Sequence, residues 1–349
     1  MDMKITGDDF KGVKFDPKNM ADFKMQTLII LAEKGVSVEF QEPNGVQFFA
    51  HGLTRQMPFI QTISKTKEPV LITGPSGTGK EIMARLIHDT SPRCKKKFVP
   101  INCGGLNEET LISELFGHVK GSFTGAVSDK KGAVDQAEKG TLFLDEIGDM
   151  PPLAQVKLLR FLNDGIFQRL GALGENTKSD VRVICATNKN LPQLIKEGTF
   201  REDLYYRINV FSVVMPPMDI TALIGKSNQE SSFDEMFRRF AIEFGYADEK
   251  TKYSYNLPKI SASALDVLKN YQFPGNYREL TNVLKYAFVK CDSKTVTPDD
   301  LPGYIFNSNL SKSGDDISSL PADEFFLAVN KLIFDRLDRE LTDQKGNVS

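Results

Sequence analysis

The chain has 349 residues, of which 40% are hydrophobic and 26% charged, and its formal net charge at pH 7 is -2. It is long enough to bury a sizeable core in two domains with extensions, and a charge so close to zero excludes a protein that grips nucleic acid by overall basicity. The lack of a long apolar run and of a signal-peptide pattern at the N-terminus favours a cytoplasmic protein without membrane contact.

Cysteines and histidines are scattered along the chain. The four cysteines form no C-x2-C pair, and only three histidines are present. This spacing spells out no metal cluster, so we expect reduced, buried thiols. The residues concerned are Cys94, Cys103, Cys185, Cys291, His51, His88 and His118.

Residues 1–50 are mixed in character, and we expect a small accessory element there, with a helix or a strand at 25–32. From His51 onward apolar runs alternate with longer helical stretches, which predicts a three-layer α/β domain. Runs that are apolar without alternation suit a parallel sheet covered on both faces. The expected strands are residues 70–73, 98–102, 141–145, 181–187 and 210–214.

A glycine-rich turn follows the first of these strands and leads into an amphipathic helix. The spacing Gly74-x4-Gly79-Lys80 is typical of a loop whose backbone N–H groups and helix N-terminus bind phosphate, with Lys80 at the β/γ-phosphates. Glu81 stands where a Ser or Thr normally holds magnesium. Taken alone, the motif leaves open a turn without ligand. The predicted loop comprises Gly74, Pro75, Ser76, Gly77, Thr78, Gly79, Lys80 and Glu81.

Polar residues fall where three other strands end, which is where ligands bind in such folds. Asp145 and Glu146 follow an apolar strand, so we expect Asp145 to organise Mg²⁺ and Glu146 to polarise an attacking water. The alternative is a solvated acidic strand end. Asn102 and the pair Thr187-Asn188 occupy the other two strand ends.

A short loop between two glycines carries a large apolar side chain, Phe123, beside the hydroxyl of Thr124. Glycine permits sharp reversals, and a Phe at such a tip needs a partner. The alternative is an ordinary turn with its Phe tucked into the core. The loop consists of Gly121, Ser122, Phe123, Thr124, Gly125 and Ala126.

Three arginines complete the set of candidates. Arg201 and Arg207 lie on an expected helix and its end, and they fit either surface salt bridges or guanidinium groups that reach a neighbouring subunit's γ-phosphate. Arg278 starts a helix after a Pro-Gly turn, and its alternative is a helix-surface role. Further helices are expected at 233–244 and 261–271, a polar loop at 225–232, a linker at 307–319 and a helical pattern at 322–341.

Together these motifs resemble the sigma-54-dependent transcription activators of bacteria, a family of AAA+ ATPases, over roughly residues 51–305. The family's loop reads GESGTGKE, so Pro75 replaces a Glu, and Ser122 replaces the Ala of the family's GAFTGA loop. After Val214 the chain lacks the family's Arg-Glu-Arg run. The matching segments are 74–81, 114–126, 140–149, 200–210 and 273–280.

The resemblance implies an AAA+ α/β domain with a small all-α lid, ATP and Mg²⁺ as cofactors, and a homo-oligomeric ring, a hexamer. It further implies that Arg201 and Arg207 act across the subunit interface, that Asn102 is a switch for the catalytic Glu146, and that residues 121–126 push on sigma-54 in the RNA polymerase holoenzyme. Thr187 and Asn188 would be the first sensor, and Arg278 the second. The implied segments are 1–50 (accessory), 51–218 (ATPase), 219–305 (lid), 306–320 (linker) and 321–349 (a helix-turn-helix that stops early).

Residues 346–349 resemble the turn after the first helix of that DNA reader, so we expect enhancer DNA binding only from a complete helix-turn-helix. The leading hypothesis is an ATP-hydrolysing activator that remodels the sigma-54 closed promoter complex. Two alternatives stay open, a generic AAA+ remodeller with another client and a nucleotide-sensing regulator with little turnover.

Overall fold

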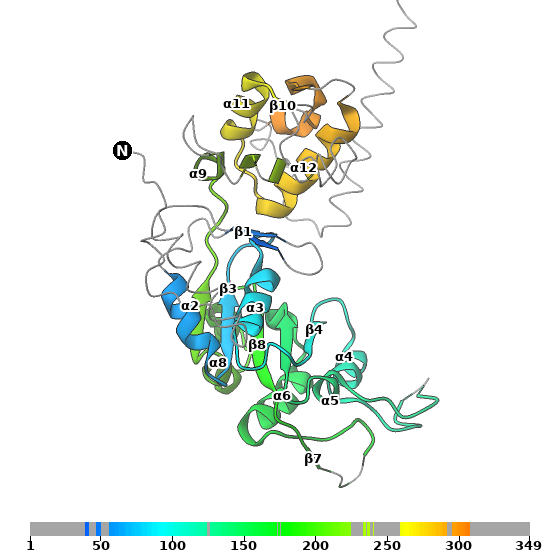
Figure 1. Ribbon diagram of the computed structural model, residues 1–349. Coiled ribbons are helices and arrows are strands. Elements are labelled where there is room, and N and C mark those ends of the chain that lie inside the picture. The colour runs from blue at the N-terminus through cyan, green and yellow to red at the C-terminus, as the bar shows by residue number, and fades with distance from the viewer. Residues whose placement is uncertain are drawn as a thin grey trace, which may run out of the picture. The chain divides into compact units, whose positions relative to one another are not determined.

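The computed structural model of the chain contains two compact units, Met1–Arg239 with Gly275–Thr281, and Phe240–Pro274 with Asn282–Ser349. Predictions for residues 25–32, 225–232, 307–319 (beyond residue 307) and 322–341 lie outside the described part of the chain. The structure describes residues 39–41, 47–49, 56–123, 126–172, 174, 176–224, 233–234, 236–237, 240, 259–291 and 295–307 (Figure 1).

The first unit is built on a five-stranded parallel sheet (Figure 1). All five expected strands are confirmed, and two of them begin one residue later than the apolar pattern suggested. The order across the sheet places β3 beside both β8 and β9, so the chain crosses over between neighbouring strands. The strands, in sheet order, are β4 Phe98–Asn102, β5 Thr141–Asp145, β8 Arg182–Thr187, β3 Val70–Thr73 and β9 Phe211–Val214.

Each strand face belongs to its own hydrophobic cluster. In β3, Val70 and Ile72 join the cluster that contains Met83 and Ile87, whereas Leu71 joins the one that contains Leu158 and Leu204. Because side chains alternate along a strand, the two clusters lie on opposite faces and make a three-layer α/β domain. One cluster holds α2 Met57–Ser64 and α3 Lys80–Asp89. The other holds α4 Glu108–Phe116, α5 Ala133–Gln136, α6 Pro152–Asp164, α7 Leu191–Lys196 and α8 Glu202–Ile208.

A buried arginine fastens the first helix to the sheet. Arg182 in β8 donates hydrogen bonds of 2.8 Å each to the carbonyl oxygens of Ser64 and Ile63, at the end of α2. These carbonyls have no partner within the helix, so the cation satisfies them. Burial lowers the pKa of Arg182 to about 10, which leaves it charged at neutral pH.

Short elements complete the first unit. Two antiparallel pairs, β1 with β2 and β6 with β7, lie outside the main sheet. Residues 233–234, 236–237 and 240 are helical, in line with the helix expected at 233–244, whose other residues lie outside the described part. The bounds are β1 Glu39–Gln41, β2 Gln47–Phe49, η3 Ile147–Asp149, β6 Ile166–Phe167, β7 Thr177–Lys178 and α9 Ile220–Ile224.

The second unit is small and mainly helical. Its α11 confirms the helix expected at 261–271, and the Ser261 hydroxyl caps it by accepting a 3.1 Å hydrogen bond from the Ala264 amide. Helix α12 contributes its later turns to this unit, and a two-stranded parallel pair joins β10 to β11. The elements are β10 Lys259–Ile260, α11 Ala262–Asn270, α12 Asn276–Lys290, β11 Thr295–Val296, η5 Pro298–Asp300 and η6 Gly303–Asn307.

One expectation about the cysteines is wrong. Cys94 is exposed, because it follows the end of α3 in a surface turn, whereas Cys103, Cys185 and Cys291 are buried. All four are free thiols. Within the described ranges no group of three or more His, Cys, Asp or Glu side chains is placed to hold a metal ion. None of the helices described has the length and apolarity that crossing a lipid bilayer requires.

Candidate functional site

The polar residues at the strand ends meet along one edge of the sheet. Asn102 is the register partner of Asp145, and Thr73 is the partner of Thr187. The Gly74 amide then donates to the Thr187 carbonyl oxygen at 3.3 Å. The sheet therefore brings the glycine-rich loop, the acidic pair and the expected sensor residues to its carboxyl edge.

The glycine-rich loop curls as a phosphate-binding loop requires. Gly74, Gly77 and Gly79 have φ angles of 152°, 74° and 88°, which side chains rarely allow. Gly79 is the N-cap residue of α3, so the loop delivers the amides of this helix N-terminus to its own concave side. The Thr78 hydroxyl braces the curl by donating to the Pro75 carbonyl oxygen at 2.8 Å.

Lys80 closes the loop on itself. Its ammonium group donates to the carbonyl oxygens of Gly74 and Pro75, both at 2.9 Å. Burial lowers the pKa of Lys80, the nearby Asp145 carboxylate opposes that change, and Arg278 adds to it. A half-buried cation held only by carbonyl oxygens can exchange them for phosphate oxygens.

Asp145 and Glu146 present two carboxylates beside this lysine. Burial raises the pKa of Asp145, while the Glu146 amide, which donates to Asp145 Oδ1 at 3.0 Å, and the Lys80 charge act against the rise. Glu146 has a φ of 52°, a conformation uncommon for a residue with a side chain. Both carboxylates are half-buried at the cleft, so they can serve a cation or a water molecule.

The remaining strand-end residues differ in exposure. Thr187 is fully buried, and its hydroxyl accepts a 3.0 Å hydrogen bond from the Lys189 amide. Asn188 is exposed at the rim, and Asn102 is exposed while its Oδ1 accepts a 2.7 Å hydrogen bond from the Gly104 amide. An ion pair of 2.5 Å between Lys189 and Asp149 ties this rim to the segment after Glu146.

The turn before α12 contacts the phosphate loop directly. Arg278 donates to the Ser76 hydroxyl at 3.2 Å, and Asn276 donates its side-chain amide to the Ser76 carbonyl oxygen at 2.8 Å. A Cβ atom at Gly77 would overlap the carbonyl oxygen of Gly275, so only glycine allows this approach. Sequence reasoning identified Arg278 but missed Asn276, whose signal was an Asn in a Pro-Gly turn, where a left-handed backbone is expected.

Arg201 and Arg207 have partners within their own chain. Arg201 makes a bidentate pair with Asp203, at 3.0 and 2.7 Å, and Asp203 raises its pKa. Arg207 donates twice to the Leu162 carbonyl oxygen, at 3.2 and 2.7 Å, near the end of α6. In the described part of the chain neither guanidinium is hydrogen-bonded to residues 74–81. Sequence reasoning missed Gln155, a buried residue whose Oε1 accepts from the Arg201 amide at 2.9 Å.

The loop at 121–126 is anchored to a second loop. The Val119 amide donates to the Leu170 carbonyl oxygen at 3.0 Å, and the Leu170 amide donates to the Gly117 carbonyl oxygen at 2.9 Å. Phe123 is half-buried with its ring edge against that of His118, at 5.0 Å between centroids. The expectation of a freely exposed Phe is therefore wrong in this state, because a neighbouring ring covers it. Thr124 and Gly125 lie outside the described residues.

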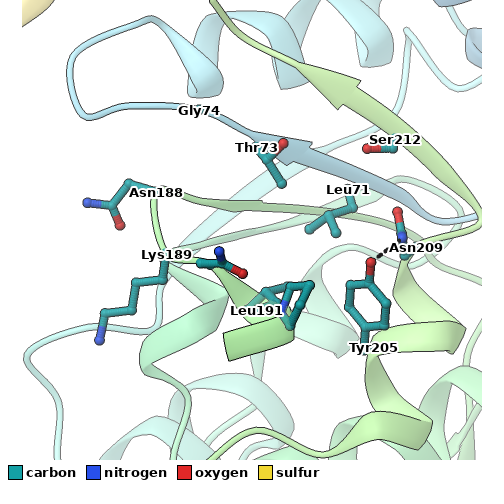
Figure 2. Close-up of a pocket in the computed structure, with 11 residues that line it drawn as sticks. Leu71, Thr73, Gly74, Asn188, Lys189, Leu191, Tyr205, Asn209 and Ser212 are labelled. Atoms are coloured by element: carbon teal, nitrogen blue, oxygen red, sulfur yellow. Dashed lines mark hydrogen bonds between the residues drawn. The ribbon is translucent and has the colours of Figure 1, made fainter. Parts of the chain in front are cut away.

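A cavity of about 360 Å³ opens on the face of the sheet that carries α7 and α8 (Figure 2). The Tyr205 hydroxyl accepts a 2.9 Å hydrogen bond from the Asn209 side chain at its wall, near Leu71 and Leu191. Of the expected ligand-binding residues it includes only Gly74 and Asn188. It is thus separate from the cradle formed around Lys80.

This parallel sheet, its curled loop and its acidic strand end define a P-loop nucleotide-binding domain of the AAA+ type. The chain belongs to the sigma-54-dependent transcription activators, as its motifs indicated. Residues 49–214 match the model of the Sigma-54 interaction domain, and residues 240–317 match that of the AAA+ ATPase lid domain.

Similar proteins include regulators from several bacteria. The nitrogen fixation protein AnfA of Azotobacter vinelandii is 43% identical over 257 residues, covering 72% of this chain and 45% of AnfA. The response regulator PilR of Pseudomonas aeruginosa is 42% identical over 249 residues, covering 69% and 51%, and AtoC of Escherichia coli is 41% identical over 243 residues, covering 70% and 50%. The chain thus spans about half the length of the curated relatives it matches.

The solved structures of NtrX from Brucella abortus resemble the chain along most of its length. The ADP complex is 30% identical with a TM-score of 0.63, covering 89% of this chain and 65% of NtrX. The ATP complex gives the same identity and coverage with a TM-score of 0.62, and a further NtrX structure covers 95% of this chain and 68% of NtrX.

Proposed function

We propose that the chain is an ATP-hydrolysing, ring-forming activator that remodels the sigma-54 RNA polymerase closed complex. The observation that carries this proposal is the meeting of Lys80, Asp145 and Glu146 at one edge of a sheet in a chain of this family. NtrX, which has the same architecture over most of this chain, was solved with ADP and with ATP.

The loop at 74–81 binds the phosphates of ATP in this proposal. Its amides and the α3 N-terminus receive phosphate oxygens, and Lys80 exchanges two carbonyl oxygens for them. Mg²⁺ fits this donor set, because it favours a few carboxylates completed by phosphate oxygens and water. Asp145 would hold it through that shell, and the lack of a closed cluster of three ligands in the described ranges agrees with a cation that arrives with the nucleotide.

Glu146 takes the proton of the attacking water. General-base catalysis requires a carboxylate with free acceptor positions close to the γ-phosphate. Mg²⁺ and the Lys80 charge stabilise the negative charge that develops on the transferred phosphoryl group. Asn102 switches Glu146, Thr187 and Asn188 detect the γ-phosphate, and Arg278 links the nucleotide to the lid.

Arg201 and Arg207 complete the site of a neighbouring subunit, as implied by the family. Their present partners, Asp203 and the Leu162 carbonyl oxygen, lie within the same chain. In the ring each guanidinium would exchange that partner for a phosphate of the next subunit. We therefore expect a homo-oligomer, a hexamer, and weak activity in the monomer.

The loop at 121–126 delivers the work to sigma-54. Phe123 rests on His118 here, and the loop's anchor at Leu170 belongs to the same α/β domain as the phosphate site. Release of Phe123 from His118 would present an apolar side chain to the promoter-bound polymerase. This partner places the protein in the cytoplasm, and binding of enhancer DNA would require a complete helix-turn-helix beyond the linker at 306–320.

The domain boundaries are part of the proposal. We infer an accessory segment at 1–50, an ATPase domain at 51–218, a lid at 219–305 and the start of a helix-turn-helix at 321–349. The test of the enzymatic claim is steady-state phosphate release as a function of protein concentration. Activity per subunit rises with concentration if the site is shared, and constant activity per subunit refutes the shared site.

Glu146→Ala serves as the catalytic knockout in the same assay. Loss of the base lowers the turnover number by about 10² to 10⁴ while ATP still binds. Glu197→Ala is the control, because Glu197 is exposed at the end of α7 and bonded to Gln193. ATP binding without phosphate release in the wild-type protein would instead support the nucleotide-sensing regulator.

A further inference from the structure

Gly104 borders the acidic pair although it is far from Glu146 in sequence. It lies two residues beyond Asn102, the last residue of β4. A Cβ atom built on Gly104 would overlap Glu146 Oε2 and lie 3.2 Å from Asn102 Oδ1. The Glu146 carboxylate therefore occupies the space that any other residue at position 104 would fill with its side chain.

The same short segment orients Asn102. The Gly104 amide donates to Asn102 Oδ1 at 2.7 Å, which fixes the oxygen end of that side chain. In the part of the chain that the structure describes, neither the Asn102 nitrogen nor the Glu146 carboxylate has a hydrogen-bond partner from a side chain. The space above Gly104 is thus a slot, bounded by Asn102, in which a carboxylate rests by shape.

We propose that Gly104 is a positioning residue for Glu146: the space left by its missing Cβ atom is a resting slot that holds the carboxylate beside Asn102, away from the attacking water. This inference rests on the proposed function, because it assigns Glu146 as the base. The slot lowers the share of time in which the base is available, so basal hydrolysis is slower than the intact machinery permits.

Alanine at position 104 tests the slot cleanly. The φ angle of Gly104 is outside the left-handed region, so an alanine backbone fits without strain. The atom that the new methyl group meets is the end of a flexible side chain and not backbone. Gly104→Ala therefore displaces the Glu146 carboxylate by about 1 Å to restore an ordinary contact distance and leaves the fold intact.

The first readout is kinetic. We expect Gly104→Ala to raise the basal turnover number about fourfold at unchanged KM for ATP, which corresponds to a carboxylate that spends about three quarters of its time in the slot. Gly303→Ala is the control, because a Cβ atom there meets nothing within 4 Å. An unchanged or reduced turnover number in Gly104→Ala overturns the resting slot.

A double-mutant cycle separates a shared slot from two unrelated effects. Asn102→Ala removes the slot's other wall, so it also raises the basal turnover number, and the double variant is no faster than the faster single variant. Multiplicative effects of the two substitutions would contradict the inference.

The second readout does not need hydrolysis. Crystal structures of nucleotide-free protein should show the Glu146 carboxylate over Gly104 in the wild type and shifted away in Gly104→Ala. An unshifted carboxylate overturns the slot. A wild-type protein that releases no phosphate defeats the proposed function, whereas the crystallographic comparison still decides whether the slot exists.

Discussion

Asn276 donates its side-chain amide to the carbonyl oxygen of Ser76 at 2.8 Å, although the two residues are 200 positions apart in the chain. The oxygen of the same side chain accepts a 2.8 Å hydrogen bond from the Met218 amide. One buried side chain thus connects the phosphate loop, the segment after β9 and the start of α12. The Tyr277 amide adds a 3.1 Å hydrogen bond to the Gly77 carbonyl oxygen.

Asn276→Asp should weaken nucleotide binding. Aspartate tolerates the left-handed backbone, with φ of 53°, and keeps the acceptor for Met218, but it loses the donor to Ser76 and adds a negative charge near the phosphates. We expect the Kd for ADP to rise about tenfold, as the loss of a hydrogen bond with added repulsion implies. Titration with a fluorescent nucleotide measures it, and Asn270→Asp, at an exposed position in α11, is the control. Equal affinity in the two variants would show that the contact is passive.

Mixing two inactive variants tests the trans role of Arg207. Arg207→Ala keeps its own Glu146, and Glu146→Ala keeps its own Arg207, so a mixed ring regains complete sites between unlike neighbours. In a random equal mixture about a quarter of the interfaces are complete, and phosphate release should recover toward that share. Failure to recover at any mixing ratio would place Arg207 in a role within its own chain.

The contact between the loop at 121–126 and Gly171 predicts a pair of stability effects. Ser122 Oγ is buried without a hydrogen-bond partner, so Ser122→Ala should stabilise the domain by about 1 kcal/mol. Gly171→Ala should destabilise it, because φ is 79° and a Cβ atom would lie 2.5 Å from the Ser122 Cβ atom.

Gly174→Ala is the matched control for that pair. Its φ of 82° imposes the same backbone strain, yet nothing lies within 4 Å of the new Cβ atom. Thermal unfolding should therefore show a larger loss for Gly171→Ala than for Gly174→Ala. Equal losses would mean that strain alone acts and that Ser122 does not press on Gly171.

His88 makes stability depend on pH. Burial lowers its pKa from 6.5 to about 4, with the Arg182 and Arg85 charges acting in the same direction, and its Nδ1 lies 2.9 Å from the Thr141 hydroxyl oxygen. Between pH 6.5 and 4 the unfolded chain binds the extra proton, so the free energy of unfolding falls as the pH falls.

His88→Gln should remove that dependence while keeping a polar partner for Thr141. Urea unfolding at pH 7 and pH 5 should show the wild type losing about 2 kcal/mol more than the variant. Parallel losses in both proteins would show that other groups set the acid limit.

Much of the nucleotide domain could be predicted because its signals are local. The strand at 70–73 is an apolar run between turn signals, and Asp145-Glu146 follows another such run, so the sheet and its ligand edge follow from sequence. The curl at 74–81 is likewise encoded by glycines whose φ angles only glycine adopts readily.

The contacts that were missed join distant segments. No local pattern says that Asn276 reaches Ser76, that Gln155 holds Arg201 or that Gly104 faces Glu146, because each depends on how layers stack. The packing of Phe123 on His118 was missed for a different reason. A glycine-flanked loop predicts freedom of the backbone, and it does not predict which neighbouring ring covers the side chain.

The most direct test of the central claim is binding to sigma-54 in a trapped nucleotide state. Protein incubated with ADP and a γ-phosphate mimic is passed with purified sigma-54 over a sizing column. The account predicts a stable complex with the wild type, and loss of that complex in Phe123→Ala while nucleotide binding and phosphate release persist. A wild-type protein that hydrolyses ATP yet forms no complex with sigma-54 would contradict the account and point to another client.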